Sequence, residues 1–577
     1  MVTSSSTSSS AGAGARRLTE EVPNRRRWGT LAVLCVTLLL ISMDNTVLNV
    51  ALPSIVRSLG ASSSQLQWMV DAYAVVFAGL LLTLGALGDR IGRKWVFMCG
   101  LAVFGGGSAA AAMSQSPDGL TLARAVMGVG AAALMPSTLS ILTNVFTGDA
   151  DRARAIGIWS GSTGLGVAAG PILGGFLLAH FWWGSVFLIN VPIAVLGLVA
   201  AVWLIPNSRT ANASPPDPVG SVLSMVGLGL LLWGIIEAPS RGWSSTAIMS
   251  ALCGAVGIIA VFVLWEHHCD HPMLPTRFFA NRRYSAAIGA LALVLFALMG
   301  MFFLMTQYLQ FVLGFSALQA GVRIAPVALA LLVLAPLSVV IARRIGTKAV
   351  VVPGMLAIAL GLGLLSGTTV NDGYGRCIIP FLLVGVGVAL ALAPCTESVM
   401  GSLPREEAGV GSATNDTAMQ VGGALGVGVL GTALDLRYQH LLEPALAHAG
   451  IPGAVQIVIR SSIGGALAVA QRAPHGEGVL LALTARRAFI SGMDLALVVA
   501  TIVVTLAAVV VACFLPNQAK RVSPAMEPLS DPADSNLSAA PSPPEARPPL
   551  CQSGPSSSVP MWVPRGRQRS AGRMEPD

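Results

Sequence analysis

The sequence predicts an all-α polytopic membrane protein with fourteen transmembrane helices. Of its 577 residues, 54% are hydrophobic and only 11% are charged, and the mean hydropathy is +0.72. Water-soluble domains carry about 25% charged residues, so this composition excludes a soluble globular fold. Apolar runs of about 20 residues, which is the length that crosses a bilayer as a helix, recur between Trp28 and Leu515.

Fourteen apolar stretches are long enough to span a membrane. In chain order they cover residues 29–53, 66–87, 95–114, 119–144, 155–179, 185–205, 218–238, 246–265, 285–313, 322–342, 349–368, 377–399, 408–434 and 489–515. Because their number is even, both ends of the chain are expected on the same side of the membrane.

Basic residues indicate which side that is. They cluster beside stretches 1, 2, 4, 8, 10 and 14, always on the side of the termini: Arg25, Arg26, Arg27, Arg90, Arg93, Lys94, Arg152, Arg154, Arg277, Arg282, Arg283, Arg343, Arg344, Lys348, Lys520 and Arg521. The opposite side is poor in Lys and Arg, apart from the long 435–488 loop. Since basic loops remain cytoplasmic, we predict a plasma-membrane protein with both termini in the cytoplasm. The net charge of +8 then requires no nucleic-acid partner.

Both terminal segments lack apolar periodicity. Residues 1–27 are rich in Ser, Ala and Arg, and residues 516–577 are rich in Pro, Ser and Arg. Such compositions cannot bury an apolar core, so we predict a disordered cytoplasmic arm and a disordered cytoplasmic tail. The eight cysteines are scattered without paired spacing, which indicates small buried side chains rather than disulfides.

A weak internal repeat divides the helical region. Residues 88–94 and 342–348 are identical at four of seven positions, at an offset of 254. Duplicated halves are common in secondary transporters, where they enclose a central site. We therefore predict a six-helix half over 28–205, an inserted helix pair over 206–266 and a second six-helix half over 267–515.

Asp44 and Arg124 are the most informative charges inside the apolar stretches, where an unpaired charge costs a few kcal/mol. Asp44 lies about 15 residues into the first stretch from the cytoplasmic side, and Arg124 about five residues into the fourth from the outer side. The two side chains therefore reach similar depths and can pair. Such a pair is either a fixed ion pair that joins two helices or a proton-coupling site.

Four other acids also lie within apolar stretches. Two of them, Asp416 and Asp71, each allow two interpretations, and the other two support no strong role. Asp416 lies near the middle of its stretch and is either a proton or cation site or a hydrogen-bonded helix contact. Asp71 is shallow in the second stretch, which indicates an outer vestibule or simple hydration. Glu397 approaches the cytoplasmic end of its stretch and is expected to be solvated, and Asp494 lies one turn into the last stretch.

Residues 266–271, Glu-His-His-Cys-Asp-His, have the composition of a metal cluster but lack a second, distant ligand set. We interpret them as an ordinary polar cytoplasmic loop. No histidine is mid-membrane, and zinc, nucleophile and P-loop motifs are absent from the sequence. We therefore predict no enzymatic activity, no metal, no cofactor and no direct drive by ATP. A membrane-embedded enzyme or channel is the alternative of a different class.

Two glycine-rich motifs favour close helix packing and tight turns. The first consists of Gly157, Gly166, Gly170, Pro171, Gly174 and Gly175. Glycines let another backbone approach, and Pro171 removes one backbone hydrogen bond and bends the helix. The second lies in the loop after the second stretch and includes Gly85, Gly88, Asp89, Arg90, Gly92 and Arg93. Its glycines permit a tight reversal, and Asp89 can pair with a cation or cap a helix.

Together these motifs resemble those of the fourteen-helix drug:proton antiporter branch of the major facilitator superfamily. The spacing over 157–175 matches that branch's fifth-helix signature completely. Residues 44–53 are similar to D-x-T-x-x-N-x-A-L-P, and residues 85–94 to G-x-L-A-D-R-x-G-R-K/R, with Gly88 in place of Ala.

Three further matches contain departures from the branch's patterns. Residues 124–132 resemble R-x-x-Q-G-x-G-A-A, with Met127 in place of Gln. Residues 183–192 resemble W-R-W-x-F-L-I-N-V-P, but Gly184 and Ser185 replace Arg and Trp. Residues 411–423 resemble G-S-A-x-N-D/N-T-x-x-x-x-G-G, with Met419 and Gln420 where Arg and Glu are common.

The resemblance implies the major facilitator fold and proton-coupled export of drugs, antibiotics or amphipathic and cationic metabolites by a monomer. It places proton coupling or the substrate path at Asp44, Arg124, Asp416 and Asp71. It makes the loop over 85–93 a conformational latch and the glycine stripe a seal against proton leak, packed on a helix of the opposite half. A dedicated exporter of one endogenous metabolite or lipid is the alternative.

Overall fold

The computed structural model describes residues 24–209, 215–269, 272–274, 276–403, 408–447 and 451–516. These residues form helices joined by short connections, without a β-strand among them. Fourteen of the helical segments are long and apolar enough to cross a membrane, which confirms the predicted fold class. Most of the predicted arm and tail lies outside the described residues.

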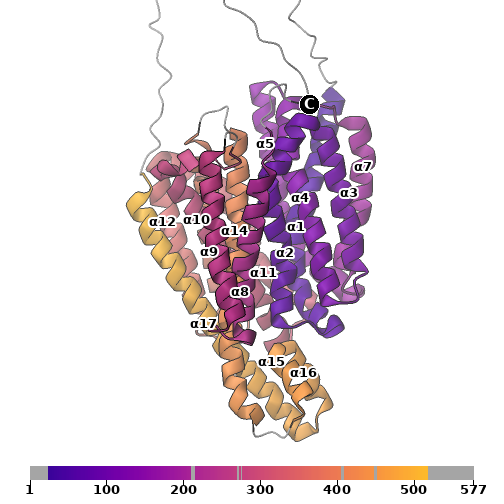
Figure 1. Cartoon of the computed structure of the whole chain (residues 1–577), viewed down its shortest axis with the longest axis vertical. Helices are drawn as coiled ribbons and strands as arrows, with labels where there is room; N and C mark the ends of the chain where they lie inside the picture. The colour runs from indigo at the N-terminus through magenta and orange to yellow at the C-terminus, as the bar shows by residue number, and fades with distance from the viewer. Residues whose placement is uncertain are drawn as a thin grey trace, which may run out of the picture. The chain divides into compact units, whose positions relative to one another are not determined.

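The helices are labelled in chain order in Figure 1. They are α1 (Asn24–Leu59), α2 (Ser63–Ile91), α3 (Arg93–Ala112), α4 (Pro117–Val145), α5 (Asp149–His180), α6 (Ser185–Leu188), α7 (Asn190–Leu204), α8 (Pro218–Arg241), α9 (Thr246–His268), the 3-10 helix η1 (Thr276–Ala280), α10 (Arg282–Gln307), the π-helix η2 (Tyr308–Val312), α11 (Ala317–Ile345), α12 (Thr347–Leu365), α13 (Gly375–Met400), α14 (Ala408–Ala447), α15 (Gly453–Ser461), α16 (Ile463–Arg472) and α17 (His475–Phe514). The sixth predicted span is divided between α6 and α7, and the ninth combines α10 with η2.

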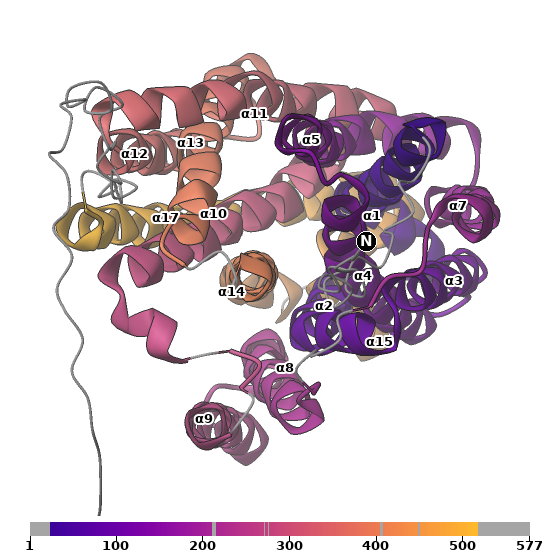
Figure 2. The same ribbon diagram turned by 90° about the horizontal axis from the view of Figure 1, so that it is seen from above.

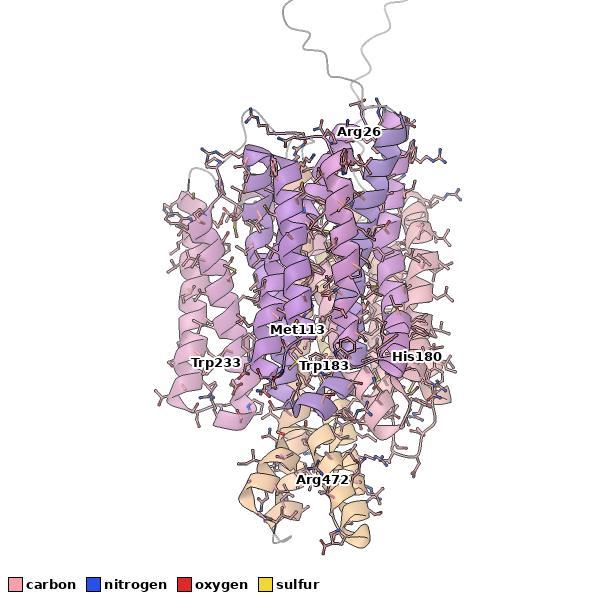
Figure 3. All side chains as sticks on the ribbon, turned by 90° about the vertical axis from the view of Figure 1, so that its right-hand side faces the viewer. Arg26, Met113, His180, Trp183, Trp233 and Arg472 are labelled. Atoms are coloured by element: carbon pink, nitrogen blue, oxygen red, sulfur yellow. The ribbon has the colours of Figure 1, made fainter. Side chains whose placement is uncertain are left out.

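The bundle has two ends, which we name by their residues. The terminal end carries Arg26, and the distal end carries Met113 and Trp183, with Arg472 beyond them (Figure 3). Helices α1, α5, α10 and α14 start at or near one end and cross to the other, as apolar stretches of this length require.

Helix packing separates two groups. In the first, α4 packs against α2 and α3, α1 against α5, and α3 against α7; in the second, α10 packs against α14, and α13 against α11 and α12. The groups meet along two seams, α5 with α11 and α2 with α14. Helices α8 and α9 pair with each other, and α8 also packs on α2 and α14 (Figure 2). Whether the two groups move as separate halves stays a prediction.

The internal repeat reappears in the turns. Ser62 and Gln65 form a capping box at the start of α2, and Ser316 and Gln319 form the same capping box at the start of α11, again 254 residues later. Each box fixes a helix start, because both side chains bond to backbone N–H groups that the helix leaves unpaired. The two groups thus begin their second helices in the same way.

The 435–488 region differs from its predicted loop. Helices α14 and α17 each contain 40 residues, or about 60 Å of helix, twice the thickness of a bilayer's hydrocarbon core. They continue past the bundle at the distal end, where α15 and α16, which connect them in the chain, also lie (Figure 1). These extensions lie outside the predicted apolar stretches because they alternate charged and apolar residues at helical spacing.

Candidate proton and substrate pathway

Asp44 and Arg124 form a buried ion pair between α1 and α4, as their similar depths predict. Arg124 Nη1 pairs with Asp44 Oδ2, and the two side chains are 1% and 2% exposed. Arg124 Nε also donates to the Met69 carbonyl oxygen at 3.1 Å, and its guanidinium carbon lies 4.3 Å from the centre of the Tyr73 ring. These two contacts come from α2 and do not involve the Asp44 carboxylate.

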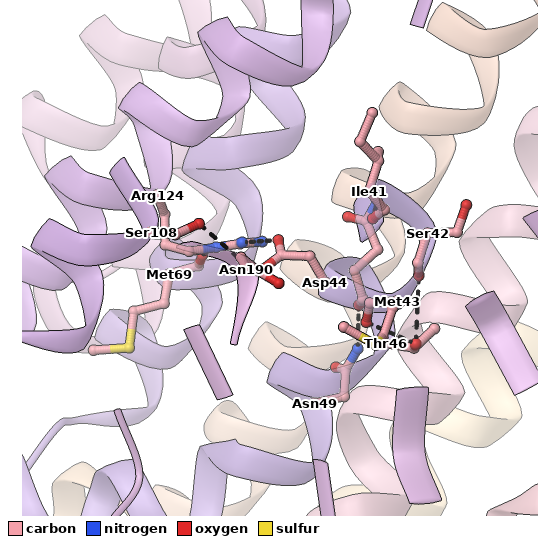
Figure 4. A network of polar contacts seen from close by, with 11 residues as sticks. Ile41, Ser42, Met43, Asp44, Thr46, Asn49, Met69, Ser108, Arg124 and Asn190 are labelled. Atoms are coloured by element: carbon pink, nitrogen blue, oxygen red, sulfur yellow. Dashed lines mark hydrogen bonds and ion pairs between the residues drawn. The ribbon is translucent and has the colours of Figure 1, made fainter. Parts of the chain in front are cut away.

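Asn190 completes the shell around the carboxylate (Figure 4). Its Nδ2 donates to Asp44 Oδ1 at 3.1 Å and lies 3.3 Å from Ser108 Oγ of α3. Both oxygens of Asp44 therefore have partners, and burial is tolerated because charge and hydrogen bonds are satisfied together. Asn190 was not predicted as a site residue. The available signal was its place as the asparagine of the 183–192 pattern, at the start of the very apolar α7.

Met127 occupies the position where the resemblance expects glutamine. Its side chain is fully buried, and a Cβ built on Gly107 of α3 would lie 2.8 Å from its Cγ. The residue thus fills the α3–α4 contact by packing and adds no polar group near Asp44.

The position of Asp71 differs from both predictions, because in this structure the side chain is not hydrated and does not line an outer vestibule. Its exposed fraction is 0%, and it lies where α2, α8 and α14 meet. A Cβ built on Gly428 of α14 would lie 3.5 Å from Asp71 Oδ2. The outer vestibule was expected from depth alone, but α8 covers this face of α2.

One turn before Asp71, Gln67 joins the two helix groups. Its Nε2 donates to Asp435 Oδ2 of α14 at 3.0 Å, and Asp435 is only 6% exposed. Sequence reasoning missed Asp435 because it falls in the segment predicted as a loop.

Asp416 lies on α14 outside the Asp44 network. Its Oδ1 accepts a bond from Asn415 Nδ2 at 3.3 Å, and Asn415 Oδ1 accepts one from Thr396 Oγ1 of α13, also at 3.3 Å. The side chain is half-buried and forms no ion pair with the described residues. A half-buried carboxylate of this kind remains available to a proton or a cation.

The glycine motif of α5 packs on both sides, and its main partner differs from the predicted one. A Cβ on Gly166 would lie 2.8 Å from the Leu39 carbonyl oxygen, and one on Gly170 would collide with Thr46 Oγ1, so this stripe faces α1 of the same group. Gly175 instead faces α11, where its Cβ would lie 2.6 Å from Leu318 Cα. The prediction that the stripe packs on the opposite half is therefore wrong for three of its glycines. Gly166, Gly170 and Gly174 share one face of α5, whereas Gly175 is turned by about 100° from Gly174 and so faces another helix.

Other members of the motif divide similarly. Gly174 faces Val47 of α1, and Pro171 lies against Gly321 of α11. No atom of another described helix lies within 4 Å of the Cβ position of Gly157, so a side chain there would meet open space.

The predicted loop over 85–93 is wrong in extent, because residues 85–91 form the last turns of α2, Gly92 alone connects the helices, and Arg93 begins α3. These residues are bound to neighbouring helices of their own group. Arg93 Nε pairs with Asp89 Oδ1 at 2.7 Å, and Arg93 Nη1 donates to the Ser140 carbonyl oxygen at 3.3 Å. Gly92 has φ +121°, a conformation that requires glycine between α2 and α3. Gly85 and Gly88 give α2 close approach to Pro136 and Ser137 of α4, respectively, and Arg90 is exposed in the last turn of α2.

The remaining acids stand apart from this pathway. Glu397 is 37% exposed and pairs with Arg343 at 2.7 Å. Glu266 is buried at the end of α9 rather than in a polar loop, and its Oε2 accepts from the Leu274 N–H at 2.8 Å. Asp270 and His271 lie outside the described residues, and within those residues no group of three or more His, Cys, Asp and Glu side chains is placed to bind a metal.

Comparisons with known proteins agree with this architecture. The family model of the Major Facilitator Superfamily matches residues 34–427. The multidrug efflux pump LfrA of Mycolicibacterium smegmatis is 37% identical over 488 residues, which cover 84% of this chain and 96% of that protein. The tetracenomycin C resistance and export protein of Streptomyces glaucescens is 34% identical over 491 residues, covering 84% and 91%.

A solved structure supports the fold. The bacterial homolog of the human lysosomal transporter Spinster superposes with a TM-score of 0.60 at 17% identity, over 86% of this chain and 99% of that one. At this identity the likeness concerns the fold alone.

Proposed function

Because this chain belongs to the Major Facilitator Superfamily, we propose that it is a proton-coupled antiporter that exports amphipathic or cationic drugs, antibiotics or metabolites. It is a multi-pass membrane protein, and in our proposal it works as a monomer in the plasma membrane. The terminal end of the bundle then faces the cytoplasm and the distal end the outside, as the basic residues predict.

The observation that carries this proposal is the enclosed Asp44 carboxylate. While ionised, it is balanced by Arg124 and bonded by Asn190. A proton on Asp44 removes the ion pair, whereas Arg124 keeps its bond to the Met69 carbonyl oxygen and its contact with Tyr73. One carboxylate can thus exchange a proton for a polar or cationic partner without leaving a second charge unsupported.

Export follows if proton and substrate favour opposite states of the bundle. A proton that binds Asp44 from the outside breaks the ion pair between α1 and α4, and its release to the cytoplasm restores that ion pair. A ligand can shift such an equilibrium only through its different affinity for the two states. Asp416, half-buried on α14, supplies a second negative charge that a cationic substrate can approach.

Two features would direct the movement between the helix groups. The close α5–α11 contact at Gly175 and Gly321 brings backbones together, which supports a seal between the groups. The Asp89–Arg93 pair ties the end of α2 to the start of α3, which supports the latch that the resemblance implies.

Vesicle transport tests the proposal. Inside-out vesicles that contain the protein should accumulate tetraphenylphosphonium, a lipophilic cation, when the lumen is made acidic. Asp44→Asn should reduce this accumulation at least about tenfold. Asp118→Asn removes an exposed acid at the distal end and should leave it unchanged. Gradient-driven accumulation at the wild-type rate by the Asp44 variant would refute the coupling role.

A dedicated exporter of one endogenous metabolite is the second candidate. The similarity to a tetracenomycin C export protein favours it, since that name records a single compound. Transport of a polycyclic aromatic metabolite such as tetracenomycin C, without transport of tetraphenylphosphonium, would select this alternative.

A further inference from the structure

Two cations from different helices meet at the end of α7. Lys94 Nζ of α3 donates to the Val202 carbonyl oxygen at 2.8 Å, and Arg26 Nε of α1 donates to the Leu204 carbonyl oxygen at 3.3 Å. Both carbonyls belong to the last turn of α7. The two positive charges therefore lie at one corner of the bundle, where α7 packs on α1 and α3 (Figure 2). We call this place the α7 corner; it is at the terminal end, which Arg26 marks in Figure 3.

The bonds to α7 leave most donors of these two side chains unused. A lysine ammonium has three N–H groups and an arginine guanidinium has five, and each side chain gives one to a carbonyl oxygen. Thr30 Oγ1 also donates to the Leu204 carbonyl oxygen, at 2.9 Å, so this helix end is satisfied without Arg26. Capping of α7 thus does not account for both cations, and their remaining N–H groups can bind an anion.

The positive charge of the corner is unbalanced within the described residues. Neither Lys94 nor Arg26 forms an ion pair there. Arg209 adds a third, exposed cation close by, because it follows Ser208, whose carbonyl oxygen accepts the N–H of Arg93 at 3.0 Å. Orientation in the membrane requires only that basic residues lie on the cytoplasmic side. It does not require them to gather at one helix end.

Exposed apolar side chains continue from these cations along α7. Trp203 is 74% exposed, and Val199 and Leu196 are exposed one and two turns before it on the same face of the helix. Trp95, which follows Lys94 at the start of α3, is 54% exposed. Tryptophan is enriched at the level of lipid headgroups, because its ring is apolar and its N–H is polar. The corner thus joins a positive patch at headgroup level to an apolar face that runs into the bilayer.

We propose that the α7 corner binds one phospholipid whose headgroup carries a net negative charge, such as phosphatidylglycerol. Its phosphate accepts N–H groups of Lys94 and Arg26, and its acyl chains lie along Trp203, Val199 and Leu196. A zwitterionic lipid fits less well, because its cationic group adds positive charge to a corner that is already positive. The assignment does not depend on which solute the protein exports.

Native mass spectrometry counts the bound lipid and tests the assignment. The purified full chain in mild detergent is titrated with phosphatidylglycerol, or with phosphatidylcholine that has the same acyl chains. Phosphatidylcholine should bind the wild type at least about tenfold more weakly than phosphatidylglycerol. Arg26→Gln/Lys94→Gln should weaken the first phosphatidylglycerol-binding step at least about tenfold, since each basic residue near an anionic lipid contributes about fivefold.

Two further variants separate site, charge and fold. Arg344→Gln/Lys348→Gln is the matched control: it removes two cations at the α11–α12 turn, where Lys348 follows Lys94 by the repeat offset of 254 residues. It should leave the first binding step unchanged. Arg26→Lys/Lys94→Arg keeps both charges and should keep the binding. Inorganic phosphate and glycerophosphoglycerol, the headgroup without acyl chains, should fail to displace phosphatidylglycerol at equal concentration.

Four results would overturn the proposal. Equal loss of phosphatidylglycerol in both Gln pairs would mean that net charge alone attracts the lipid, and equal affinity for phosphatidylcholine would exclude an anionic site. Displacement of the lipid by inorganic phosphate would assign the corner to free anions. Loss of binding in Arg26→Lys/Lys94→Arg would show that the charges do not hold the lipid.

Discussion

The two helix groups share backbone turns but not charges. Gly60 and Gly314, 254 residues apart, both have a positive φ, at +66° and +71°, and Gly92 and Gly346 repeat the same relation at +121° and +99°. By contrast, α10 carries no ionisable side chain between Tyr284 and Tyr308, where α1 carries Asp44. The repeat therefore determines architecture, and the coupling charge that we propose belongs to the first group alone.

Breaking the charge pair should give the largest effect. Arg124→Met leaves Asp44 buried without its cation, which costs about 3–5 kcal/mol, so export driven by a pH gradient should fall at least about a hundredfold. The double variant Asp44→Asn/Arg124→Met leaves no buried charge and should regain wild-type thermal stability but not coupled export. Uptake of tetraphenylphosphonium and thermal unfolding measure the two effects separately. Coupled export by the double variant would show that the pair is only a structural ion pair.

The glycine stripe offers the next largest effect. Gly170→Leu would force Thr46 and the α1 backbone away, and overpacking of this kind costs about 1–3 kcal/mol. Because Thr46 follows Asp44 by two residues, we expect normal insertion with lost export or with proton leak, measured by vesicle acidification. Gly161→Leu is the matched control, since nothing lies within 4 Å of its Cβ position. Tight coupling in the Gly170 variant would mean that α1 and α5 separate without harm.

Asn190 sharpens the comparison because it bonds to Asp44, and the second group has no acid that corresponds to Asp44. Asn190→Ala removes one bond to a charged oxygen, worth about 1.5–3 kcal/mol, so export driven by a pH gradient should fall by at least about tenfold. Ser108→Ala keeps the Asn190–Asp44 bond and should lower export much less. Equal export by wild type and the Asn190 variant would contradict this positioning role.

The repeated turns provide the smallest effect. Gly60→Ala and Gly314→Ala each place a side chain in a left-handed conformation, at a cost of about 1–2 kcal/mol, and both sites have open space around the Cβ position. We expect the two variants to lower the thermal unfolding midpoint by similar amounts. A much larger decrease in the unfolding midpoint for one variant would show that the two turns contribute differently to stability despite their common geometry.

Much of the fold follows from the sequence because hydropathy and glycine act locally. Fourteen spans, the turn at Gly92 and the similar depths of Asp44 and Arg124 all depend on residue type and helical rise. Which helices and side chains contact each other depends on tertiary packing, and the spacing of residues along the sequence does not determine that packing. The Gly170 stripe therefore faces α1 instead of the opposite group, Asp71 is covered by α8, and Asn190 reaches Asp44 from a helix far along the chain.

Proton release on substrate binding tests the central claim most directly. When tetraphenylphosphonium is added to purified protein in weakly buffered solution that is acidic enough to protonate Asp44, the wild type should release protons as the cation binds, because proton and substrate compete for Asp44. Asp44→Asn should release almost none, while Asp118→Asn should match the wild type. Equal proton release by the wild type and the Asp44 variant would contradict the account.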